Sequence, residues 1–219
     1  MCQDKDTMPP VYIQDSHRER FKTIVDYLFP RDSTSFILLG RDIDSTILSK
    51  YQSFQIESWL VEDGVYGYLE LLYRGSRDGW DSEDFHAKCD NKGATVAVIR
   101  SSDGFIFGGF ADKSWKSSGG YCESDKAFLL SLKSPESEVG PKNMSINQNK
   151  CSSAMGHVSS YGPTFGGYND LYIGSDANNN SSSSSNLGHT YELPPGQTNT
   201  FLVGSKNFKV SEIEVFQII

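Results

Sequence analysis

The stretch that most constrains the fold runs from residue 69 to 115 and is centred on a hairpin. Ala94 to Ile99 is an apolar run of strand length, and Asp103-Gly104 follows it. Asp-Gly favours a tight hairpin turn because both residues tolerate positive φ. Phe105 to Phe110 is therefore expected to return as the antiparallel partner. Gly108-Gly109 within it indicates a bulge or a place where another backbone comes close.

A strand and a short helix are expected just before this hairpin. Leu69 to Arg74 has the alternating pattern of a strand with at least one buried face. Arg74 to Gly79 is expected to be a polar turn. The next helix begins near residue 81, and Phe85 and Cys89 share one of its faces because they are four residues apart.

The rest of the chain predicts short strands, many turns and few helices. The capping box Ser49 to Gln52 predicts a helix from about residue 49 to 60. A second box, Ser16 to Glu19, predicts an amphipathic helix that Pro30 ends. The low-complexity segment from Asp176 to Asn186 is expected to be a loop with nothing to bury. Further strands are expected at residues 128–132, 144–146, 170–173, 191–193, 201–203 and 207–219, the last with a bulge near Ser211.

Composition agrees with this pattern and excludes several classes of function. The 20 glycines and 12% aromatic residues predict a fold that is mainly β with short helices (α+β). The net charge of −8 disfavours a nucleic-acid binder and an electrostatic membrane anchor. No apolar run is long enough to span a bilayer, and the polar start, MCQDKDTMPP, is no signal peptide. We therefore expect a cytoplasmic chain with no nucleic-acid partner and no integral membrane segment.

The four cysteines have spacings that match no zinc or redox motif, and are Cys2, Cys89, Cys122 and Cys151. They are expected to be reduced cytosolic thiols. A thiol-based peroxide scavenger at Cys89 and Cys122 is one alternative function, since a low-pKa thiol reacts with peroxide. However, Cys89 lies at the C-terminal end of its helix, and the charges of Glu123 and Asp125 would raise the pKa of Cys122. Both observations count against such an oxidative-stress enzyme.

The segment Asp42-Ile43-Asp44-Ser45-Thr46 follows an apolar run, Phe36 to Leu39. Haloacid dehalogenase-type phosphatases use D-x-D-x-T after a strand to present a nucleophilic and a general-acid Asp to phosphate and Mg²⁺. A polar turn is the favoured interpretation here. Those enzymes need a parallel sheet with long alternating helices, and the sequence after residue 94 does not show that pattern.

His86 lies among the acidic residues Asp81, Glu83, Asp84 and Asp90, so a metal site there is conceivable. Asp81 and Glu83 are better explained as acids at a helix N-terminus. No dinucleotide, phosphate-loop, serine-hydrolase or zinc-protease motif is present. We therefore expect no catalytic residues, no metal and no cofactor.

The chain resembles the TLDc domain family from about residue 34 to 219. The resemblance rests on numerous motifs in the family's order: ILSKYQSFQIESWL, LLYRGSRDGW, the hairpin with its Phe-Gly-Gly, Trp115, DKAFLLSL, YGPTFGGYNDLYI, SNLGHTYE and FLVGSKNFKVSEIEVF. It implies a two-layer antiparallel β-sandwich flanked by helices. Residues 1–33, an N-terminal tail with the amphipathic helix, match nothing in the family and are expected to lie outside the domain.

The resemblance also implies a function, because the family is associated with protection from oxidative stress and with the vacuolar proton-pumping ATPase. It has no agreed active site. We therefore expect a non-catalytic cytosolic interaction module that binds and regulates the soluble sector of that pump, peripheral at endolysosomal membranes through this partner. Loops on a rigid sandwich usually carry recognition. The candidate partner-binding residues lie in two such loops and are Ser118, Gly119, Gly120, Glu123 and Asp125 in the first, and Gly162, Phe165, Gly166, Gly167 and Asn169 in the second.

Overall fold

The computed structural model describes residues 42–136 and 138–219. The expected helix at residues 16–28, the strand at 36–39 and the domain boundary at residue 33 lie outside this part of the chain. Three α-helices and one 3₁₀ helix are described, namely α2 (Lys50–Glu62), α3 (Gly75–Asp78), α4 (Ser82–Cys89) and η2 (Cys151–Ser153). The strands are β1 (Leu69–Arg74), β2 (Thr95–Ser101), β3 (Ile106–Ala111), β4 (Tyr121–Cys122), β5 (Phe128–Lys133), β6 (Lys142–Ser145), β7 (Met155–Gly156), β8 (Thr164–Phe165), β9 (Leu171–Tyr172), β10 (Ser183–Ser185), β11 (Asn207–Phe208) and β12 (Val210–Ile218).

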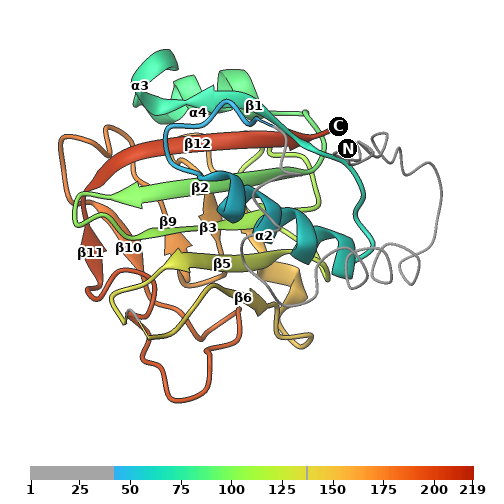
Figure 1. Cartoon of the computed structure of the whole chain (residues 1–219). Coiled ribbons are helices and arrows are strands. Elements are labelled where there is room, and N and C mark those ends of the chain that lie inside the picture. Colours follow the sequence, from blue (N-terminus) through green and yellow to red (C-terminus); the bar gives the residue numbers. More distant parts are fainter. Residues whose placement is uncertain (1–41, 137) are drawn as a thin grey trace, which may run out of the picture. The chain divides into compact units, whose positions relative to one another are not determined.

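These strands form two six-stranded sheets, and every strand pairing within them is antiparallel (Figure 1). The first sheet has the order β1-β12-β2-β3-β5-β6, and the second has the order β11-β10-β9-β8-β7-β4. The predicted mainly β fold, with two antiparallel sheets and short helices, is confirmed.

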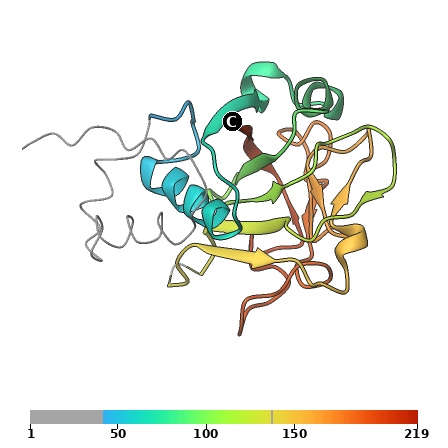
Figure 2. The same ribbon diagram turned by 90° about the vertical axis from the view of Figure 1, so that its right-hand side faces the viewer.

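The first sheet is buried on both faces, because the second sheet covers one face and α2 the other (Figure 2). Ala97 and Ile99 pack into the core between the sheets, whereas Val96 and Val98 pack into the cluster beneath α2. Neither face of this strand is exposed to solvent, which explains why the sequence from Ala94 to Ile99 is an apolar run rather than an alternating pattern. At the centre of the inner core, the Trp115 ring meets Phe85 and Phe165 edge-on, and its Nε1 donates to Thr95 Oγ1 at 2.9 Å.

The predicted hairpin is the pair β2–β3, with Arg100 opposite Ile106. Of the two turn residues, only Gly104 adopts positive φ, at +81°. The return strand needs its glycines because of close approach. A Cβ on Gly108 would lie 1.9 Å from the carbonyl oxygen of Ala97. One on Gly109 would lie 2.8 Å from the Phe165 ring.

Local helix signals are also confirmed. Ser49 caps α2, since Ser49 Oγ accepts from the Gln52 N–H at 3.3 Å and Gln52 Oε1 accepts from the Ser49 N–H at 3.0 Å. The expected polar turn at residues 74–79 contains a single helical turn, α3. The C-terminal strand β12 lies between β1 and β2, and its register shifts between Val210 and Glu212, as the predicted bulge requires.

Three expectations about later segments are wrong. Residues 176–186 were expected to bury nothing, yet Ala177, Ser183 and Ser185 are fully buried, and the serines belong to β10. Their hydroxyls are satisfied inside the sheet, as Ser183 Oγ accepts from the Gly174 N–H and Ser185 Oγ donates to the Asp170 carbonyl. Residues 201–203 are buried but form turns rather than a strand. Residues 191–193 contribute only an isolated bridge, between Tyr191 and Ile146.

Candidate functional site

The phosphatase-like segment has both of its aspartates in ion pairs. Lys50 Nζ lies 2.6 Å from Asp42 Oδ1, and this hydrogen bond lowers the pKa of the Asp42 carboxyl. Asp44 Oδ1 lies 2.8 Å from Arg74 Nη2, which also donates to the Asp44 carbonyl. The two carboxylates therefore hold cations of the chain itself.

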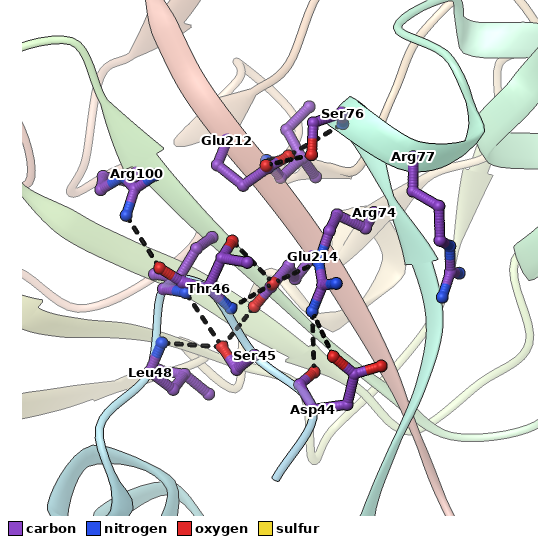
Figure 3. Close-up of polar contacts among 12 residues, drawn as sticks. Asp44, Ser45, Thr46, Leu48, Arg74, Ser76, Arg77, Arg100, Glu212 and Glu214 are labelled. Atoms are coloured by element: carbon purple, nitrogen blue, oxygen red, sulfur yellow. Dashed lines mark hydrogen bonds and ion pairs between the residues drawn. The ribbon is translucent and has the colours of Figure 1, made fainter.

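The same segment is bound to β12 through Glu214, whose carboxylate is fully buried (Figure 3). Glu214 Oε1 accepts from the Thr46 N–H at 2.8 Å, from Thr46 Oγ1 at 3.1 Å and from Arg74 Nε at 2.7 Å. Its Oε2 accepts from Ser45 Oγ. Arg100 Nη1 adds a bond to the Thr46 carbonyl at 2.9 Å. These bonds compensate for burying the charge and give the segment a structural role in holding the chain that enters α2.

A second buried carboxylate lies two residues earlier on β12. Glu212 is 4% exposed, and it accepts from the Ser76 N–H at 3.1 Å and from Ser76 Oγ at 2.6 Å (Figure 3). It thereby holds the start of α3 to the sheet. Sequence reasoning missed both glutamates, since a charged residue in a strand is usually exposed.

His86 is in an acid–histidine–serine cluster, but not in the order of a catalytic triad. Its Nδ1 lies 2.7 Å from Asp90 Oδ1, and Ser117 Oγ donates to Asp90 Oδ2 at 2.9 Å. Its Nε2 faces the carbonyl of Tyr161 at 3.0 Å rather than a hydroxyl. In a triad the histidine lies between the nucleophile and the acid.

In residues 42–136 and 138–219, no group of three or more His, Cys, Asp or Glu is placed to hold a metal ion.

The two candidate redox thiols have raised pKa values. Burial raises the pKa of the fully buried Cys89 thiol, and Asp90 adds to the effect. Burial, followed by the charge of Asp112, raises the pKa of Cys122. The thiolate is the reactive form, so both shifts work against peroxide chemistry at neutral pH.

The two predicted partner-binding loops lie next to each other. β4 of the first loop pairs with β7, and β7 pairs with β8 of the second loop. Tyr121 Oη donates to the Gly167 carbonyl at 2.7 Å, which joins the loops directly. The first loop is also tied to His157, whose carbonyl accepts from the Gly119 N–H at 2.7 Å.

Some of the predicted partner-binding residues are exposed, and the others are buried. All five first-loop residues are exposed, and they are Ser118, Gly119, Gly120, Glu123 and Asp125. In the second loop, Gly167 and Asn169 are partly exposed, whereas Gly162, Phe165 and Gly166 are buried. Phe165 packs in the inner core, so it supports the loop rather than presenting a contact surface.

The two predicted loops, Ser118 to Asp125 and Gly162 to Asn169, each contain an exposed tyrosine that the sequence analysis did not single out. Tyr121 is 56% exposed and Tyr168 is 69% exposed. The Tyr168 ring lies edge-on to His189, with centroids 4.2 Å apart. We call the surface formed by Ser118 to Tyr121, Gly167 to Asn169 and His189 the tyrosine surface. The available signal was an aromatic residue next to each Gly-Gly pair.

A buried carboxylate holds the tyrosine surface in shape. Asp170 is fully buried, and its oxygens accept from the N–H groups of Gly188, His189 and Thr190, each at 2.9 Å. Gly166 leaves room for it, since a Cβ there would lie 2.1 Å from Asp170 Oδ2. The loop carrying His189 is therefore fixed to the loop carrying Tyr168.

Comparison with protein-family models matches the TLDc domain over residues 42–219. This chain belongs to the TLDc domain family. Among curated proteins, it is 28% identical over 128 residues to the mTOR-associated protein MEAK7 of Xenopus laevis, which covers 56% of this chain and 25% of that protein. It is 36% identical over 62 residues to MEAK7 of Gallus gallus, covering 28% of this chain and 13% of that protein. The matches thus span a quarter or less of these relatives.

Membership places every group described above within the TLDc domain, since both glutamates and the tyrosine surface fall in residues 42–219. The part of this TLDc domain that the structure describes has no helix long and apolar enough to cross a bilayer. Its most exposed large aromatic residue is Tyr168 of the tyrosine surface.

Proposed function

We propose that this chain is a non-catalytic interaction module that binds a protein partner through the tyrosine surface. The observation that carries the proposal is the bond from Tyr121 Oη to the Gly167 carbonyl, at 2.7 Å. It joins two loops that lie 46 residues apart in sequence. A fixed, exposed pair of tyrosines is suited to recognition, because tyrosine is enriched among residues that dominate interface energetics and loses little entropy on binding.

The TLDc resemblance implies the partner, which we propose to be the soluble sector of the vacuolar proton-pumping ATPase. Glu123 and Asp125 lie exposed beside Tyr121. The net charge of the whole chain is −8, and these two exposed carboxylates favour a partner with a basic contact surface. In this proposal the chain is cytoplasmic, reaches endolysosomal membranes only through the pump, and contributes to oxidative-stress protection by regulating it.

A pull-down from cell lysate with the full chain tests this, with bound proteins identified by mass spectrometry and proton-pump ATPase activity assayed in parallel. We expect the wild type to recover soluble-sector subunits and to change the hydrolysis rate. Tyr168→Ser should lose both effects, and Tyr121→Phe, which removes only the hydroxyl bond to Gly167, should weaken them.

Tyr66→Ser is the matched control, because Tyr66 is 43% exposed and lies in the segment between α2 and β1. It should behave as the wild type. Equal recovery by Tyr168→Ser and Tyr66→Ser would rule out the tyrosine surface. Since the relatives are named for association with mTOR, recovery of mTOR without pump subunits would instead assign that partner.

A further inference from the structure

The first sheet ends at β6, and part of this edge has no partner strand among residues 42–136 and 138–219. Residues 190–192 begin to pair with it, as the Glu192 N–H donates to the Ser145 carbonyl and the Asn147 N–H donates to the Thr190 carbonyl, both at 2.9 Å. The bridge between them is Ile146 opposite Tyr191. Ser145 therefore turns its backbone groups away from β5.

The register shows why the pairing stops. Backbone direction alternates along an antiparallel strand, so Asn143 also turns its N–H and C=O outward. The β5–β6 register, with Phe128 opposite Ser145 and Leu130 opposite Asn143, has no shift. Continuing from the Ile146–Tyr191 bridge, the residue opposite Asn143 would be Pro194, which has no N–H to donate. Among the described residues, none outside the ladder donates to or accepts from the Asn143 backbone.

A groove of about 560 Å³ lies along this open edge. Its lining includes Val139 and the exposed Leu193 as apolar contacts. Gln197 also lines it, and the Gln197 Oε1 is buried without a hydrogen-bond donor in the part of the chain that the structure describes. The groove thus combines the outward backbone groups of Asn143, the apolar side chains of Val139 and Leu193, and the Gln197 Oε1, an acceptor without a donor in the described part of the chain.

The charges of the groove indicate the chemistry of its occupant. Two carboxylates, Glu138 and Glu192, line it together with one cation, Lys142. Each of the three has no ion pair with any described residue. The local balance is one negative charge, in a chain whose net charge is −8. A basic segment is therefore favoured over an acidic one.

We propose that the edge of β6 at Asn143 is a second docking site, which accepts a short extended peptide of a protein partner carrying alternating aliphatic and basic side chains. The peptide adds a strand to the first sheet at the position that Pro194 leaves open. Its backbone pairs with the N–H and C=O of Asn143, its aliphatic side chain contacts Val139 and Leu193, and its basic side chain faces Glu138 or Glu192. The site is separate from the tyrosine surface and does not depend on it.

Fluorescence anisotropy with an acetylated, fluorescein-labelled Val-Lys-Val-Lys-Val-Lys peptide and the full chain tests the proposal. We expect saturable binding that weakens about tenfold with Asn143→Pro, which removes the outward N–H, and stays unchanged with Asn143→Ala. A peptide with proline at its third position, or with Glu in place of Lys, should bind more weakly by a similar factor.

Pro194→Val provides a second variant in case Asn143→Pro disturbs folding. It restores the missing N–H, so the chain's own segment should extend along β6 and exclude the peptide. Absence of saturable binding, or equal binding of the proline-containing peptide, would overturn the proposal. So would a concentration-dependent dimer in analytical ultracentrifugation that Asn143→Pro abolishes, because the occupant would then be a second copy of the chain.

Discussion

Arg74 Nε lies 2.7 Å from Glu214 Oε1, and this ion pair joins the edge strand β1 to the fully buried carboxylate of β12. Arg74 also reaches Asp44, so one guanidinium connects two strands and the segment that enters α2. The network lies at the β1 edge of the first sheet, and the two faces of this sheet pack into the two clusters of the core.

Replacing Glu214 with Gln should destabilise the fold by about 2–4 kcal/mol, since Arg74 loses its buried partner and one of the donors to Glu214 then faces an amide NH₂ group. Urea unfolding followed by tryptophan fluorescence measures this. Glu70→Gln, at an exposed carboxylate on β1, is the control and should leave the midpoint unchanged. Equal midpoints for the two variants would show that the buried pair contributes nothing.

Replacing Asp170 with Asn should release the loop that carries His189. Asn has one oxygen where Asp170 uses two to accept from Gly188, His189 and Thr190, and the loss of a buried acceptor costs about 2–3 kcal/mol. Hydrogen exchange of those three amides should become faster, and partner recovery through the tyrosine surface should fall. Asp103→Asn, in the exposed hairpin turn, is the control. Unchanged exchange at residues 188–190 would contradict this role.

The elements that sequence predicted well are those specified by neighbouring residues. The β2–β3 hairpin follows from two apolar runs around Asp103-Gly104, the start of α2 from a capping box, and the bulge at Ser211 from a change of phase. Each signal spans a few residues, so it can be recognised without knowledge of the tertiary structure.

The features that sequence missed depend on residues far apart. Glu214 reaches Thr46, 168 residues away, and Asp170 reaches Thr190, 20 residues away. The serines of β10 were expected in a loop because a polar, low-complexity composition indicates nothing to bury. They are buried in β10, and their hydroxyls bond to the backbone of Asp170 and Gly174, which lie on either side of β9. The Gly-Gly pair before Tyr168 marks its loop in the sequence, but the exposure of the Tyr168 side chain depends on how that loop packs.

Neither Cys89 nor Cys122 should react with mild peroxide at neutral pH. Burial raises the pKa of both thiols, so the thiolate fraction is low. Peptide-level mass spectrometry after peroxide treatment should show both thiols unchanged. Because the pKa of the Cys122 thiol is raised, iodoacetamide should label Cys122 only at a higher pH than it labels a free cysteine, whose pKa is about 8.5. Cys89 should stay protected until the protein unfolds. Sulfenic acid at Cys122 at pH 7 would favour the thiol-scavenger alternative instead.

His157 should make the fold less stable as the pH falls. Burial is the main cause that lowers the pKa of its imidazole, and the charges of Lys116 and His86 lower it further. The Asp90 carboxylate acts in the opposite direction and raises this pKa. Its Nε2 is buried without a partner in the described residues, beside the Trp115 ring. A histidine in the unfolded chain takes up a proton near pH 6.5, while the folded one resists it. The free energy of unfolding therefore contains the full contribution of neutral His157 above pH 6.5, and this contribution decreases as the pH falls below 6.5.

Urea unfolding at pH 7.5, 6.5 and 5.5, compared between the wild type and His157→Phe, isolates this effect from other titrating groups. The wild type should lose up to about 1.4 kcal/mol more per pH unit below pH 6.5 than the variant, which is the limit for one proton. Phe fits the apolar contact with Trp115 and has no nitrogen to protonate. Parallel pH curves for the two proteins would place the pH dependence elsewhere. Because the His157 backbone holds Gly119 and Gly120, the same acidification should also loosen the first loop of the tyrosine surface and weaken partner recovery at pH 5.5.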